Sequence, residues 1–158
     1  MLEKLKKEVF EANMEIVRSG LVKLTWGNVS GIDRKRGLIV IKPSGVPYSK
    51  MMPKHMVVVD LAGKVVDGKL KPSVDMPTHV CLYRAFSKIG GITHIHSLYA
   101  ASFAQACREI PALGTTHADY FYGPLNVTRA LTKKEIEKDY TGNTGGIIIE
   151  IFRKLDPM

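Results

Sequence analysis

Short runs of β-branched residues separated by tight turns constrain this fold more than any other feature of the sequence. Residues 38–42 read LIVIK and end at a Pro-Ser-Gly turn at 43–45, and residues 56–60 read MVVVD. An Ala-Gly-Lys turn at 62–64 then leads into a Val-Val pair. A strand, a short turn and a second strand predict a β-hairpin, so part of the sheet should be antiparallel.

Helices are expected on both sides of these strands along the chain. Residues 2–18 carry apolar side chains at a period of 3.6 and are followed by Gly20, a helix stop signal. Residues 76–87 place Pro77 at the start of a second helix, and residues 98–107 form a third that is rich in small residues.

The remaining elements are a weak strand at 27–32, a strand at 92–96, a loop, and a short helix with a Thr132 and Glu135 capping box. Residues 146–152 (GIIIEIF) read as a buried strand. This order lacks the regular βαβ alternation of a dinucleotide fold. We therefore expect one domain over residues 1–158 with an α+β layered fold and a mostly antiparallel sheet.

Composition excludes several classes of protein. The 158 residues are 45% hydrophobic, as in ordinary globular proteins, and no apolar run approaches the ~20 residues of a membrane span. The N-terminus has no signal-peptide features, and Cys81 and Cys107 read as buried thiols, so we expect a cytoplasmic protein with no membrane partner. The net charge of +8 could serve nucleic acid, but the basic residues are scattered, which favours a solvated surface.

The sharpest chemical feature is the Thr-His-Ile-His-Ser run at 93–97. Residues two apart in a strand point to the same face, about 6–7 Å apart at the backbone. His94 and His96 could therefore converge on one metal ion, or be two surface histidines. A catalytic zinc site usually needs a third protein ligand. Asp75 is a candidate ligand or base, although an Asp at a helix start is more often a cap.

The other histidines and two polar clusters leave more than one interpretation open. His55 reads as a surface residue, His79 as a core or supporting group, and His117 as able to reach the site without a spacing that demands it. Asp119, in the aromatic segment 114–123, could be a general acid/base or a salt-bridged surface residue.

The second polar cluster could bind an anion. Lys42, Ser44 and the amide of Gly45 could form an anion cradle, to which Ser73 could add a hydroxyl group, but a plain Pro-Ser-Gly turn explains the pattern equally well.

Several segments together resemble the class II aldolase/adducin family. They are LTWGNVS (24–30), IKPSGV (41–46), KPSVDMPTH (71–79), GGITHIHS (90–97) and GTTHADYFYG (114–123), in the family's order and spacing over nearly the whole chain. The last segment is closer to the pentulose-phosphate 4-epimerase branch than to the fuculose- and rhamnulose-phosphate aldolases.

This resemblance implies a fold, a reaction and a site. The fold is a three-layer α/β/α arrangement around a mostly antiparallel sheet. The reaction is inversion at C4 of a pentulose 5-phosphate, L-ribulose 5-phosphate to D-xylulose 5-phosphate, by retro-aldol and aldol steps. The metal would be Zn²⁺, or Mn²⁺ or Co²⁺, and the assembly a homotetramer. The implied site comprises metal ligands Asp75, His94 and His96, phosphate-site residues Gly27, Asn28, Lys42, Ser44, Gly45, Ser73 and Val74, and the acid/base Asp119.

The sequence departs from the family pattern in two ways. No residue matches the family's third histidine ligand or its C-terminal tyrosine, so we expect a truncated domain with an incomplete metal site. Position 74 is Val where the family tends to have Ser. The alternatives are an inactive member that only binds phosphate or self-associates, a sugar-phosphate aldolase, and a basic nucleic-acid binder, which lacks any binding motif.

Overall fold

The computed structural model describes residues 2–153. Its helices and strands, in chain order, are α1 (Glu3–Arg18), β1 (Asn28–Asp33), β2 (Leu38–Ile41), η1 (Tyr48–Lys50), η2 (Pro53–His55), β3 (Val57–Asp60), β4 (Val65–Asp67), α2 (Met76–Ala85), β5 (Gly91–His94), α3 (Leu98–Gln105), α4 (Thr115–Tyr120) and α5 (Lys133–Phe152). None of these helices is both long enough and apolar enough to cross a bilayer.

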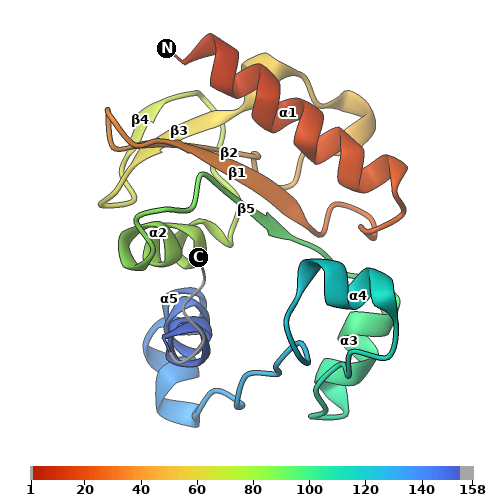
Figure 1. The fold of residues 1–158 in the computed structure, drawn as a ribbon. Helices are drawn as coiled ribbons and strands as arrows, with labels where there is room; N and C mark the ends of the chain where they lie inside the picture. Colours follow the sequence, from red (N-terminus) through yellow and green to blue (C-terminus); the bar gives the residue numbers. More distant parts are fainter. Residues whose placement is uncertain (1, 154–158) are drawn as a thin grey trace.

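The described strands form one antiparallel sheet in the order β4-β3-β2-β1-β5. Helix α1 covers one face, and α2 covers the other with α5 packed beneath it (Figure 1). The expected α+β class, with a three-layer arrangement around an antiparallel sheet, is therefore confirmed. Helices α3 and α4 lie together to one side, beyond the end of β5 (Figure 1).

The strand sequences explain why both faces are covered. Ile39 and Ile41 face a buried cluster on the α2 side, whereas Val40 between them faces a cluster on the α1 side. Side chains alternate across a strand, so a continuous β-branched run is apolar on both faces and needs a layer on each.

Helix α1 is fixed to the sheet by a buried amide as well as by apolar packing. The Asn13 side chain accepts a hydrogen bond from the Val29 amide at 2.9 Å and donates to the Val29 carbonyl at 3.0 Å. Asn13 is fully buried, so these bonds also satisfy a polar group that would otherwise destabilise the core. They hold the start of β1, where the candidate site begins.

Two expectations about the second half of the chain are wrong. Residues 146–152 are the end of helix α5, not a strand. They are helical because α5 packs along α2, and the two helices come closest at Gly145. The segment expected to be a loop around Asp119 contains the short helix α4.

Two smaller expectations also need correction. Strand β5 ends at His94, and the His96 amide donates to the carbonyl of Leu21 instead of continuing a strand. Cys107 is exposed, not buried, and Cys81 is partly buried. Both are free thiols, as expected for a chain without a disulfide framework.

Candidate functional site

One cavity collects polar side chains from segments that are far apart in the sequence. Its volume is about 530 Å³, and it opens where β1, the end of β2, the start of α2 and the end of β5 meet. The residues that line it are Thr25, Trp26, Gly27, Asn28, Lys42, Ser44, Gly45, Ser73, Val74, Asp75, His94, His96 and Tyr140.

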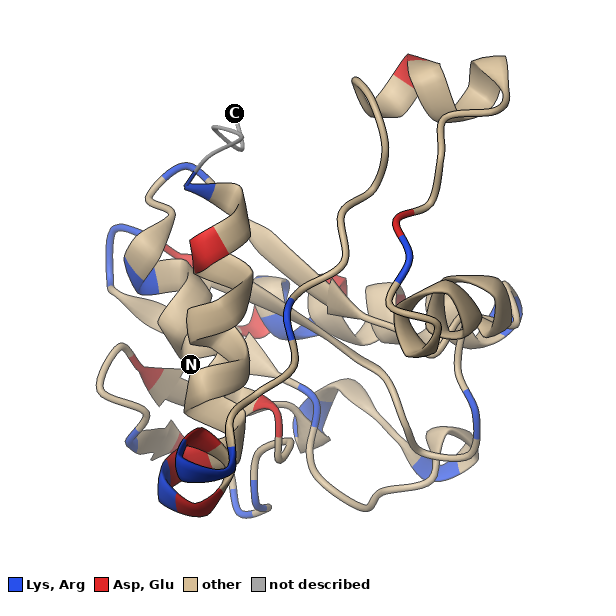
Figure 2. Ribbon diagram, turned by 90° about the horizontal axis from the view of Figure 1, so that it is seen from below, with Lys and Arg blue, Asp and Glu red and all other residues tan. Residues whose placement is uncertain are grey.

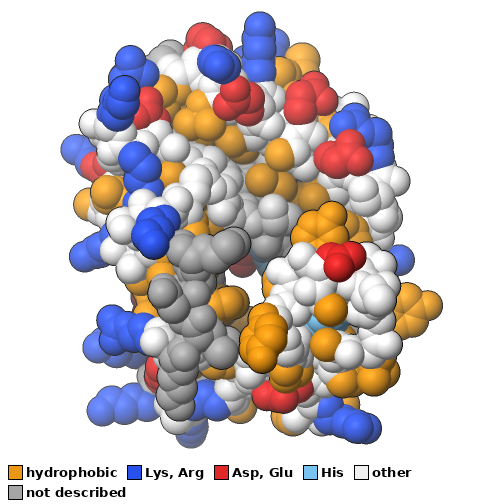
Figure 3. Space-filling view, viewed as in Figure 1, with side chains coloured by type: hydrophobic (Ala, Val, Ile, Leu, Met, Phe, Trp, Pro, Cys, Tyr) orange, Lys and Arg blue, Asp and Glu red, His pale blue; other side chains and the backbone are white. Residues whose placement is uncertain are grey.

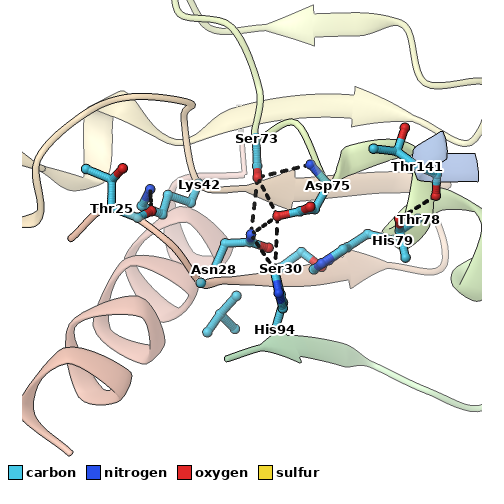
Figure 4. A network of polar contacts seen from close by, with 12 residues as sticks. Thr25, Asn28, Ser30, Lys42, Ser73, Asp75, Thr78, His79, His94 and Thr141 are labelled. Carbon is cyan, nitrogen blue, oxygen red and sulfur yellow. Dashed lines mark hydrogen bonds and ion pairs between the residues drawn. The ribbon is translucent and has the colours of Figure 1, made fainter. Parts of the chain in front are cut away.

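Sheet register brings the two halves of the site together. In the antiparallel β1–β5 pair, Asn28 stands directly opposite His94. The Asn28 amide donates to Oδ2 of Asp75 at 2.7 Å and lies 3.2 Å from Oγ of Ser73 (Figure 4). Asn28 therefore links β1 to the start of α2 and to the end of β5.

Asp75 is directed into this network and does not cap its helix. It occupies the N-cap position of α2 but makes no capping side-chain bond. Its Oδ2 lies 3.0 Å from Nδ1 of His94. This bond, together with the Asn28 amide, lowers the pKa of Asp75 to about 2, although burial acts in the opposite direction. Asp75 is therefore a carboxylate at neutral pH, and its role as a plain helix cap is excluded.

The two histidines of the sequence motif lie side by side although His96 is outside the strand. Their ring centroids are 4.9 Å apart, and the Trp26 ring contacts His96 at a centroid distance of 5.6 Å. Because an ionised carboxylate only accepts, a neutral His94 donates from Nδ1 to Asp75 and keeps Nε2 as an electron-pair donor.

The donor types here suit a divalent ion. Asp75, His94 and His96 offer one carboxylate and two imidazoles, which are ligands that zinc accepts. Nearby, Oδ1 of Asn28 is buried without a hydrogen-bond partner within residues 2–153, so the network has an unused acceptor. Within residues 2–153, no three His, Cys, Asp or Glu side chains are arranged so that they could hold one metal ion. The three side chains therefore have the right atom types for a metal ion, but they do not converge on one point.

Another part of the same cavity is suited to an anion. Lys42 is only 2% exposed, and its ammonium donates to the carbonyl oxygens of Thr25 at 3.2 Å and Pro43 at 3.4 Å. Burial lowers the pKa of Lys42, while the charge of Asp75 acts in the opposite direction. With neutral oxygens as its hydrogen-bond partners, this buried cation attracts an anion in the cavity.

Two glycines allow the backbone to line this cavity. Gly27 has φ of +93°, and a Cβ atom there would lie 2.7 Å from Cγ1 of Val22. Its carbonyl accepts a hydrogen bond from the Tyr48 hydroxyl at 2.7 Å. Gly45 has φ of +68° in the turn after Lys42, a conformation that other residues rarely adopt. The Ser44 amide donates to the Lys71 carbonyl, which holds this turn against the segment that carries Ser73.

A buried polar network behind the cavity orients helix α2. His79, which is 1% exposed, contacts the Ser30 hydroxyl through Nδ1 at 2.7 Å, and the same hydroxyl lies 2.9 Å from the Tyr83 hydroxyl. Burial lowers the pKa of His79 to about 4, so the ring is neutral at pH 7. The network fixes α2 against β1 and thereby the position of Asp75, one turn before His79.

Most residues that the sequence singled out meet in this cavity. The ten residues expected at the metal or phosphate all line it, whereas Asp119 and His117 lie on α4 and do not. His55 is partly exposed in η2. The sequence analysis did not single out Thr25, Trp26 or Tyr140 as site residues, although all three line the cavity. No local sequence pattern marks Tyr140 as a site residue.

Comparison with solved structures identifies proteins of the same fold. A solved L-fuculose 1-phosphate aldolase matches with a TM-score of 0.75 and 24% identity over 97% of this chain and 86% of that chain. An L-fuculose-1-phosphate aldolase from Thermus thermophilus matches with a TM-score of 0.73 and 20% identity over 94% and 73% of the two chains. The chain thus has the fold of the class II aldolases.

Sequence comparison identifies the family. Residues 7–150 match the Class II Aldolase and Adducin N-terminal domain, so the chain belongs to this family. The L-ribulose-5-phosphate 4-epimerase UlaF of Salmonella paratyphi B and that of Salmonella typhi are each 54% identical to it over 157 residues. These alignments cover 99% of this chain and 69% of the relatives' length. The resemblance seen in the sequence is confirmed.

Proposed function

We propose that this chain forms the substrate site of a metal-dependent pentulose-phosphate 4-epimerase that interconverts L-ribulose 5-phosphate and D-xylulose 5-phosphate. One observation carries the proposal: a single cavity holds a buried lysine with serine hydroxyls and, adjoining them, a carboxylate with two imidazoles. A sugar phosphate has the same two parts, an anionic group and a set of oxygens. The similarity to the UlaF proteins supports the choice of substrate.

The phosphate binds at Lys42 in this proposal. The Ser44 and Ser73 hydroxyls and the turn amide of Gly45 line the same part of the site and supply neutral donors. The Lys42 ammonium supplies the charge, and its burial strengthens the attraction because little water screens it. These residues hold the end of the substrate that does not react.

The sugar oxygens lie at the other end, where Asp75, His94 and His96 would hold Zn²⁺, Mn²⁺ or Co²⁺. When bound, the ion supplies Lewis-acid stabilisation of negative charge on the sugar oxygens. Asp75 keeps its negative charge and fixes the tautomer of His94 through the Nδ1 bond. The ring of Trp26 lies beside that of His96.

The reaction we propose is cleavage and re-formation of the C3–C4 bond. Cleavage removes the proton of the C4 hydroxyl and yields a three-carbon enediolate and glycolaldehyde phosphate. The aldehyde rotates to present its other face, and its oxygen takes back a proton when the bond re-forms, so C4 is inverted and all atoms are conserved. Asp119 is the proposed acid/base for one face.

Asp119 lies on α4, exposed and outside the cavity, so it would need another chain to bring it to a substrate. No residue of α3 or α4 is buried, and the two helices carry exposed apolar side chains: Leu98, Tyr99 and Tyr120. Figure 2 shows that few charged residues lie on these helices, and Figure 3 shows apolar side chains gathered over this part of the surface. We propose that the chain self-associates through α3 and α4 as a tetramer in the cytoplasm, which would place Asp119 at an interface.

Activity on L-ribulose 5-phosphate tests the proposal. The purified chain is assayed for D-xylulose 5-phosphate with and without added Zn²⁺, next to Lys42→Met and His96→Asn. We expect turnover that needs the ion and falls at least tenfold in each variant. Release of dihydroxyacetone and glycolaldehyde phosphate would show an aldolase instead. Phosphate binding without turnover would show the non-catalytic alternative.

A further inference from the structure

Helix α5 changes direction at Asp139. Among residues 133–152, only the neighbouring Tyr140 lines the cavity. The backbone of Asp139 leaves the helical conformation there, with φ of −167° and ψ of 87°. Its Oδ1 accepts a hydrogen bond from the Gly142 amide at 3.0 Å, which is the bond made by a helix N-cap. Residues 140–152 are therefore a separately capped helix, and Tyr140 is its first residue.

The first turn of this second helix is tied to α2. The hydroxyl of Thr78 donates to the carbonyl of Thr141, and Figure 4 shows this bond on the same helix that carries His79. Further along α5, Gly145 packs closely against Cys81. The position of Tyr140 is thus set by α2, the helix that also begins at Asp75.

The hydroxyl group of Tyr140 does not help to hold the fold together. Its side chain is 59% exposed, and its hydroxyl makes no hydrogen bond within residues 2–153. The side chain nevertheless lines the cavity that contains Lys42, Asp75 and His96. An exposed tyrosine with a free hydroxyl, held at a substrate-sized cavity by a helix cap and an anchoring bond, has the properties of a ligand contact.

We propose that Tyr140 is a substrate-contacting residue whose phenol hydrogen-bonds to a hydroxyl group of the bound sugar phosphate and whose ring forms one wall of the site. This inference rests on the proposed function, because it assigns Tyr140 to the sugar part of that substrate. The phosphate part already has Lys42, Ser44 and Ser73. Tyr140 therefore distinguishes a sugar phosphate from phosphate alone.

Binding measurements on the whole chain test this role. Calorimetric dissociation constants are measured for L-ribulose 5-phosphate and for inorganic phosphate, with the wild type and Tyr140→Phe. The variant loses one hydrogen bond, so we expect sugar-phosphate binding to weaken on the order of 3- to 10-fold and phosphate binding to stay unchanged. Ser19→Ala, which removes an exposed hydroxyl at the end of α1 outside the cavity, is the control and should change neither.

The outcomes separate this inference from the proposed function. Wild type that binds phosphate but not L-ribulose 5-phosphate would overturn the proposed function and the role of Tyr140 with it. Normal wild-type binding with no effect of Tyr140→Phe would overturn the role of Tyr140 alone. Equal weakening of both ligands would show a general change in the cavity and would also overturn it. Thr78→Val, which removes the anchoring bond, should weaken sugar-phosphate binding in the same selective way.

Discussion

The carboxylate of Asp75 and the imidazole of His94 lie 3.0 Å apart although 19 positions separate them in the sequence. Asp75 stands at the start of α2, and His94 ends β5. The carboxylate accepts both the His94 Nδ1–H and an amide hydrogen of Asn28 at 2.7 Å. This one side chain therefore sets the tautomer of a histidine and the orientation of an asparagine at the candidate site.

Replacing Asp75 tests this arrangement. Asp75→Asn removes the negative charge and puts an amide where two donors converge, so we expect zinc affinity to fall about 10- to 100-fold. Competition titration with a zinc-sensitive dye measures this loss. Glu11→Gln, an exposed carboxylate on α1, is the control for charge alone and should leave the affinity unchanged. Equal zinc affinity in Asp75→Asn and wild type would exclude Asp75 from the metal site.

His79 should make the fold sensitive to mild acid. Its folded-state pKa is lowered by burial to about 4, below the ordinary value of 6.5, so the unfolded chain binds more protons between these values. The contribution of neutral His79 to the free energy of unfolding is therefore fully present above about pH 6.5. It is lost as the pH falls toward 4, by up to about 3 kcal/mol. Urea unfolding at pH 7, 6 and 5 measures the slope.

The control for this pH dependence is a matched pair of variants. His79→Gln should be less stable at pH 7, because its bond to Ser30 is altered, but should lose less further stability on acidification. His55→Gln, a partly exposed residue in η2, should keep the wild-type slope. The protonation of Asp75 belongs to a lower window, from about 3.8 down to 2, and does not interfere. An unchanged slope in His79→Gln would disprove the assignment.

Two adjacent glycines of α5 should respond to alanine in opposite directions. A Cβ atom at Gly145 would lie 2.8 Å from Cβ of Cys81 and 3.2 Å from the Thr78 carbonyl oxygen, so Gly145→Ala should destabilise the fold by about 1–3 kcal/mol. At Gly146 a Cβ atom meets nothing within 4 Å, so Gly146→Ala should stabilise the helix by up to about 1 kcal/mol. Thermal unfolding of both variants checks this, and destabilisation by both would contradict the described packing of α2 on α5.

Val74 offers a gain-of-binding test. Its side chain is 68% exposed at the cavity, next to Ser73, so a change there does not disturb the core. Val74→Ser adds a hydroxyl donor, and we expect inorganic phosphate to bind about 2- to 10-fold more tightly with an unchanged melting temperature. Val74→Ala, which shortens the side chain without adding a donor, separates the hydroxyl from the loss of bulk. Tighter binding by both variants would mean that steric access, not the hydroxyl, controls the affinity.

Local patterns in the sequence were enough for the elements near the N-terminus. The β-branched runs in 38–42 and 56–60 predicted β2 and β3, and the 3.6-residue period predicted α1. These patterns succeed because each strand or helix meets its covering layer on a fixed set of positions. The pattern failed at 146–152, where three consecutive isoleucines favour a strand but tertiary packing on α2 holds a helix.

The sequence by itself therefore determined the fold class, the family and most of the residues that gather in the cavity, because those depend on side-chain type and local spacing. Only the tertiary structure decided how they meet. The β1–β5 register places Asn28 opposite His94, and the turn of α5 at Asp139 brings Tyr140 into the cavity. Register and helix docking depend on contacts between distant segments, which no local period encodes.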